Sequence, residues 1–97
     1  MDTLQDVEKR LSAIRPELKK KFKVQVIGVF GSVARGDESA GSDIDLLVDL
    51  DDDADLIDMV GLSQHLEEQL HRKIDIIPRR ALRPELSDRI LRETLYL

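Results

Sequence analysis

Residues 26–48 read VIGVFGSVARGDESAGSDIDLLV, and this stretch decides the fold. The apolar, β-branched run from Val24 to Phe30 stops at Gly31 and predicts a largely buried strand. A second run of the same kind, Ile44 to Leu50, predicts a second strand. Between them, three glycines and several small polar residues indicate a loop with one helical turn over 32–35.

Helical patterns flank this stretch on both sides. Apolar residues at steps of three and four predict an amphipathic helix over 2–14, which Pro16 ends, kinks or follows with a further short turn. A second helix is predicted with one apolar face made of Leu56, Met59, Val60, Ser63, Leu66 and Leu70.

The rest of the chain supplies one more strand and one more helix. Lys73 to Ile77 predicts a short strand that Pro78 stops. Pro84 suits the first turn of a last helix, whose inward residues we expect to be Leu86, Ile90, Leu91 and Leu95. This order predicts one α/β (α+β) domain over residues 1–97, with a small mixed three-stranded sheet flanked by helices. Its exposed edges invite a partner.

Charge and composition exclude several classes of protein. Fifteen basic against twenty acidic residues give a net charge of −5, which argues against direct nucleic-acid binding. The chain has no cysteine, so it holds neither disulfides nor thiolate metal sites, which fits a cytoplasmic protein. No apolar run approaches the roughly 20 residues that a membrane span needs.

Two carboxylates flank Ile44 at the start of the second predicted strand. Asp43 and Asp45 stand two residues apart, so their side chains point to the same face of the strand. Like charges this close repel and raise one another's pKa. A hard divalent cation such as Mg²⁺ offsets the repulsion, because it prefers carboxylate oxygens.

A third acid, Asp75, interrupts the apolar strand between Ile74 and Ile76. If the second and third strands are neighbours, about 4.8 Å apart, Asp75 completes a three-carboxylate cluster. Three acids can hold two Mg²⁺ ions, a pair that aligns an attacking and a leaving oxygen in phosphoryl chemistry.

Gly31 and Ser32 follow the first buried strand directly. Gly31 lets the backbone approach a phosphate closely, and Ser32 offers its hydroxyl and N–H as hydrogen-bond donors. A phosphate binder, two acids at i and i+2 and a third acid on another strand are the parts needed to transfer a nucleotide from a nucleoside triphosphate.

With these residues in place, GSVARG at 31–36 followed by SDIDLLV at 42–48 resembles the signature of the polymerase-β-type nucleotidyltransferases. In particular the chain is similar to the minimal nucleotidyltransferases (MNT), as is its ending ILRETLYL. The resemblance implies an Mg²⁺-dependent enzyme with two ions per site. It also implies an antitoxin that pairs with a HEPN-family toxin and transfers AMP from ATP to a hydroxyl of that toxin, most typically a tyrosine.

The resemblance assigns roles residue by residue. Asp43 and Asp45 would bind both metal ions, and Asp75 would bind the catalytic ion and help deprotonate the acceptor hydroxyl. Residues expected at the nucleotide are Gly31, Ser32, Arg35 and Ser42.

Other interpretations remain open from the residues alone. Asp43 and Asp45 can be a solvated strand start, and Asp75 can pair with Arg72 or Lys73. Arg35 either pairs with nearby acids or contacts phosphate. The cluster Arg79, Arg80 and Arg83 is either solvated surface or a contact to toxin or nucleotide.

Two other functions also stay open. The chain could be a non-catalytic antitoxin that masks a toxin's surface, or an enzyme that modifies a small molecule such as an aminoglycoside. The lack of a second substrate domain weighs against the latter.

Overall fold

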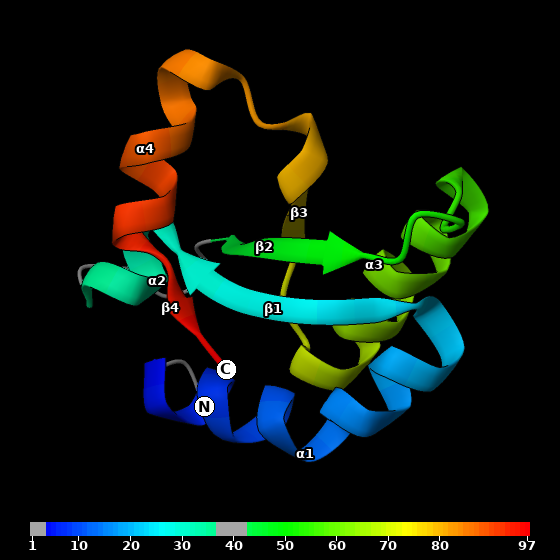
Figure 1. Cartoon of the computed structure of the whole chain (residues 1–97). Helices are drawn as coiled ribbons and strands as arrows, with labels where there is room; N and C mark the ends of the chain where they lie inside the picture. Colours follow the sequence, from blue (N-terminus) through cyan, green and yellow to red (C-terminus); the bar gives the residue numbers. More distant parts are fainter. Residues whose placement is uncertain (1–3, 37–42) are drawn as a thin grey trace.

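The computed structural model describes residues 4–36 and 43–97. Its elements are α1 (Leu4–Phe22), β1 (Val24–Phe30), α2 (Gly31–Arg35), β2 (Ile44–Leu50), α3 (Leu56–Leu70), β3 (Ile74–Pro78), the 3-10 helix η1 (Arg79–Ala81), α4 (Pro84–Glu93) and β4 (Leu95–Tyr96). The expected order of helices and strands is therefore present, with short additional elements near the C-terminus (Figure 1).

The sheet has the strand order β3-β2-β1-β4. β1 runs antiparallel to β2 and to β4, whereas β2 and β3 are parallel. The sheet is mixed, as expected, but it has four strands and not three. The prediction that Leu95 lies on the last helix is wrong: the backbone extends at Thr94, and Leu95 pairs with β1 together with Tyr96.

Gly28 is what allows this fourth strand to approach. A Cβ atom at Gly28 would overlap the Thr94 side chain and lie 3.2 Å from the Leu95 carbonyl oxygen. A larger residue at this position would push β4 away from β1.

Two helices, α1 and α3, cover one face of the sheet (Figure 1). Alternate residues of β2 point to them: Ile44, Leu46 and Val48 are fully buried. The same core contains α1 and α3 side chains such as Leu11 and Leu66. This packing leaves the intervening β2 position, Asp45, on the other face of the sheet.

Pro16 lies inside α1, which continues to Phe22. A proline in a helix interior costs about 3 kcal/mol because one backbone hydrogen bond is lost. Leu18, one half-turn further on, is fully buried, and its burial offsets part of that cost. The helix ends before Lys23, which adopts a left-handed conformation with φ of 62°.

The predicted inward faces of two helices are partly wrong. On α3, Leu56 and Val60 are 77% and 49% exposed, and the buried face is formed by Leu62, Leu66 and Leu70. On α4, Leu86 is 47% exposed. No residue of α4 is fully buried, because the helix stands beside the sheet and not on it (Figure 1).

Within residues 4–36 and 43–97, no helix combines the length and apolarity needed to cross a membrane.

Candidate active site

The turn from β1 into α2 brings a glycine against a carboxylate. Phe30 pairs with Asp45 across β1 and β2, so Gly31 begins α2 directly beside Asp45. Gly31 has φ of +75°, a conformation that other residues adopt at a cost. A Cβ atom here would also overlap the Asp45 carboxylate and lie 3.0 Å from its Cγ. Both the backbone conformation and the neighbouring carboxylate therefore require glycine at this position.

The parallel pairing of β2 and β3 sets two acids side by side. Asp45 pairs in register with Asp75, as Ile44 does with Ile74. Because both isoleucines point into the core, both aspartates lie on the opposite face. The two strands are thus the neighbours on which a three-acid cluster depends. Asp45 is half-buried, whereas Asp75 is exposed.

Asp45 experiences the charges of its neighbours. Its pKa is raised above the usual value of 3.8, first by burial and then by the negative charges of Asp75 and Asp43. The nearby positive charge of Arg35 opposes this shift of the Asp45 pKa. A half-buried carboxylate facing two others, with one cation nearby, is the kind of perturbed group that marks functional sites.

Arg35 connects this acidic cluster to the last helix. Its guanidinium Nη1 lies 3.6 Å from Glu93 Oε2, which joins α2 to α4. Of the two roles left open for Arg35, the pairing with acids is thus present, and its charge also reaches Asp45. Sequence reasoning missed Glu93 as the partner of Arg35, because its spacing of four from Arg89 indicates only the local pair that these two residues also form.

The remaining predicted residues are placed as follows. Asp43 immediately precedes β2 and is exposed, and Ser32 is the second residue of α2. Ser42 lies outside the described residues. In the part of the chain that the structure describes, no three His, Asp or Glu side chains converge closely enough to hold a metal ion.

The donor chemistry nevertheless fits a hard divalent cation. The acids beside Asp45, Asp43 and Asp75, offer only carboxylate oxygens, and their negative charges raise the pKa of Asp45. Mg²⁺ takes oxygen ligands and keeps several waters, so it needs only one or two protein carboxylates.

Two of the three clustered arginines have partners within the protein. Arg79 lies 3.9 Å from Asp49, and Arg80 donates to the Ala54 carbonyl at 2.9 Å. Both contacts lie at the far end of β2 from Asp45. This arrangement favours a structural role for Arg79 and Arg80.

Comparison with known proteins places this geometry in a family. The model of the family described as "Nucleotidyltransferase domain" matches residues 11–97. The protein adenylyltransferase MntA of Thermococcus cleftensis is 36% identical over all of this chain and 98% of its own length.

Solved structures support the same family assignment. A minimal nucleotidyltransferase superimposes with a TM-score of 0.85 and 36% identity, covering 98% of this chain and 96% of its own. A toxin–antitoxin crystal structure with AMP-PNP matches with a TM-score of 0.71 and 27% identity, over 87% of this chain and 69% of the other. The chain belongs to the nucleotidyltransferase domain family, and its similarity to a minimal nucleotidyltransferase extends over almost its whole length.

Proposed function

We propose that this chain transfers AMP from ATP to a hydroxyl group of a partner protein, and that the partner is the HEPN-family toxin of a toxin–antitoxin pair. The observation that carries the proposal is the in-register pair Asp45–Asp75 beside Gly31. The similarity to a protein adenylyltransferase and to a toxin–antitoxin structure with an ATP analogue supports the choice of donor and partner.

At the donor, Gly31 and Ser32 would hold the terminal phosphates. The absence of a side chain at Gly31 lets the backbone N–H groups approach phosphate oxygens. Ser32 would donate from its hydroxyl and N–H, with Arg35 and Ser42 as further contacts. Arg35 would then exchange its contact with Glu93 for one with phosphate.

At the reacting centre, the acceptor oxygen forms a bond to the α-phosphorus of ATP while the bond to pyrophosphate breaks. Asp75 would take the proton from the acceptor hydroxyl, since it is exposed and therefore accessible to a protein substrate. Asp43, Asp45 and Asp75 would hold two Mg²⁺ ions. These ions would neutralise phosphate charge and align the two oxygens.

Mass spectrometry of the partner toxin tests the proposal. Incubation with the chain, Mg²⁺ and ATP should add one or more AMP units, and Asp43→Asn should abolish the addition. The matched control is Asp52→Asn, which removes an equally exposed acid outside the site. A toxin that stays unmodified with the wild-type chain, at full ATP, overturns the proposal.

A second function, toxin masking without catalysis, is favoured by exposed apolar side chains. Leu56 and Ile57 at the start of α3 are 77% and 80% exposed. Contiguous exposed apolar patches mark protein contacts, and these two neighbouring side chains are candidate members of such a patch. Inhibition of the toxin without modification, retained by Asp43→Asn, would select this function.

A further inference from the structure

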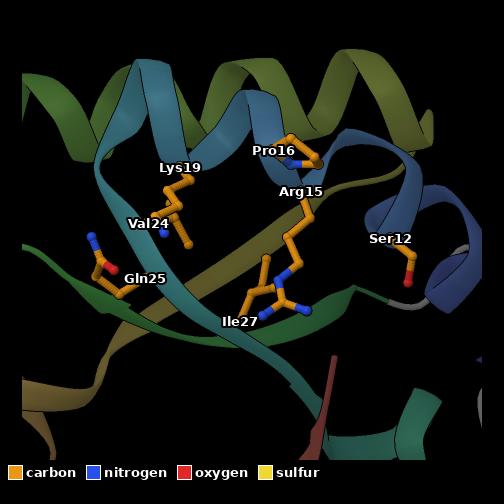
Figure 2. Close-up of a pocket in the computed structure, with 7 residues that line it drawn as sticks. All are labelled: Ser12, Arg15, Pro16, Lys19, Val24, Gln25 and Ile27. Carbon is orange, nitrogen blue, oxygen red and sulfur yellow. The ribbon is translucent and has the colours of Figure 1, made fainter.

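A groove runs between α1 and the beginning of β1, away from the acidic cluster. Its volume is about 460 Å³. Residues of both elements line it: Ser12, Arg15, Pro16, Lys19, Val24, Gln25 and Ile27 (Figure 2). One wall is therefore a helix and the other is the edge region of a strand.

The strand wall has an open edge. β4 pairs with β1 only at Gly28 and Val29, and the Leu97 N–H donates to the Ile27 carbonyl at 3.0 Å. From Val24 to Val26, no described strand pairs with β1 on this side. This open stretch continues the line of β4 along β1. Such an edge is a template for one more strand.

The helix wall carries positive charge. Arg15 and Lys19 stand one turn apart on α1, and Figure 2 shows both side chains extending toward β1. None of the residues that line the groove is acidic. In a chain with a net charge of −5, this is a local basic strip. Its charge is complementary to an acidic ligand.

We propose that this groove binds an extended acidic segment of a partner protein by strand addition. The segment's backbone would pair with β1 from Val24 to Val26, and its carboxylates would meet Arg15 and Lys19. An exposed sheet edge with side chains beside it that select the ligand is the arrangement that strand addition uses. Nucleic acid fits less well, because two cations are a small footprint and a strand edge offers it no matching partner.

The groove lies apart from the reacting centre. Phe30 stands three positions beyond Ile27, which is about 10 Å along an extended strand. A segment bound here would leave Gly31 and Asp45 accessible. Strand addition would therefore tether a partner to the enzyme without occupying its active site, which raises the partner's effective concentration.

Fluorescence polarisation with a labelled nonapeptide of alternating Glu and Thr tests this inference. Binding should weaken about fivefold for Lys19→Glu or Arg15→Glu. The matched control, Lys20→Glu, changes an exposed neighbouring lysine that does not line the groove and should leave binding unchanged. A Lys–Thr peptide should not bind.

A backbone control separates strand addition from charge attraction alone. The same Glu–Thr peptide with alternate N-methylated residues keeps its charges but cannot pair along one edge. It should not bind, and only the unmodified peptide should slow amide exchange between Val24 and Val26. Equal binding of both peptides, or equal effects of Lys19→Glu and Lys20→Glu, overturns the proposal.

Self-pairing of two copies through this edge is also tested. Sedimentation should show the wild-type chain unassociated at the peptide-binding concentrations; a dimer that the peptide does not dissociate overturns the proposal. These assays contain no nucleotide, so their failure leaves the proposed transfer reaction untouched.

Discussion

Two acid-rich regions lie close together in the sequence, yet their environments are opposite. Around Asp45, carboxylates face one another and its pKa is raised. In the segment 51–58, Lys23 lies 3.5 Å from both Asp53 and Asp58. The pKa of Asp58 is lowered, first by its hydrogen bond from the Asp55 backbone N–H. The acids of segment 51–58 have hydrogen-bond and ion-pair partners in the fold, whereas within the described part of the chain the negative neighbours of Asp45 outweigh the charge of Arg35.

These opposite environments separate a candidate ligand-binding acid from acids that hold the fold together. Asp55 and Asp58 form a reciprocal capping box that begins α3, so their charges stabilise the fold. Among residues 4–36 and 43–97, Asp45 gains no comparable partner, and its ionisation is disfavoured by burial and by its acidic neighbours. An acid that the fold disfavours is the better candidate for ligand chemistry.

Asp45→Asn should produce the largest effect. Transfer activity should fall by more than about a hundredfold, because even changes to groups behind a metal ligand cost 10–100-fold. Chemical denaturation at pH 7 without metal should show equal or higher stability, because a disfavoured charge is removed. A large loss of stability would contradict the assignment.

The effect of Asp45→Asn on stability should depend on pH, because the pKa of Asp45 is raised in the folded protein. A raised folded-state pKa means that the folded protein binds more protons than the unfolded chain, so stability falls as pH rises above 3.8 through the folded-state pKa. Any advantage of Asp45→Asn should therefore disappear when the pH is lowered below 3.8. Denaturation curves across this range measure it.

Mg²⁺ and ATP together should stabilise the wild-type chain. At a hundredfold excess of ligand over Kd, the gain is about 2.7 kcal/mol. Thermal unfolding should show this gain only when both are present, and Asp45→Asn should lack it. An equal shift from ATP without metal would argue against carboxylate-held Mg²⁺.

Gly31→Ala should cost stability as well as activity. The left-handed conformation costs a non-glycine residue roughly 1–2 kcal/mol, and the added Cβ also meets the Asp45 carboxylate. Gly36, with φ of +76° but nothing within 4 Å of its Cβ position, is the matched control. Gly36→Ala should lower the free energy of unfolding by a similar amount, because its backbone conformation is also left-handed, but it should keep far more transfer activity.

Asp55→Ala should have the smallest effect of these variants. In contrast to Asp45→Asn, it should lower stability and leave transfer activity unchanged. Loss of the N-cap of α3 should lower stability by about 1 kcal/mol. Transfer activity per folded molecule should stay unchanged, because the cap lies at the other end of β2 from Asp45. Loss of activity without loss of stability would erase the contrast between the two acidic regions.

The adjacency of Asp45 and Asp75 was predictable from the sequence. Acids that interrupt two apolar strands at matching depth need only parallel, in-register pairing to meet, and β2 and β3 pair in this way. The two-residue strand β4 was not predictable, because Leu95 also fits the helical spacing of α4. The room for β4 depends on Gly28, a contact between residues far apart in sequence.

The exposed faces of α3 and α4 were misjudged for a related reason. Periodicity shows that a helix has an apolar stripe, but not how much of that stripe the sheet covers. Leu56 continues the stripe of α3 beyond the edge of the core and is left in solvent. The groove beside β1 likewise depends on where β4 stops, which no local pattern indicates.

The most direct test is to titrate the Asp45 carboxyl carbon by NMR, in the wild-type chain and in Asp75→Asn. We predict an elevated pKa in metal-free wild type, a drop toward 3.8 in Asp75→Asn, and a drop in wild type when Mg²⁺ and AMP-PNP are added. An Asp45 pKa that neither the substitution nor the metal–nucleotide changes would contradict the account.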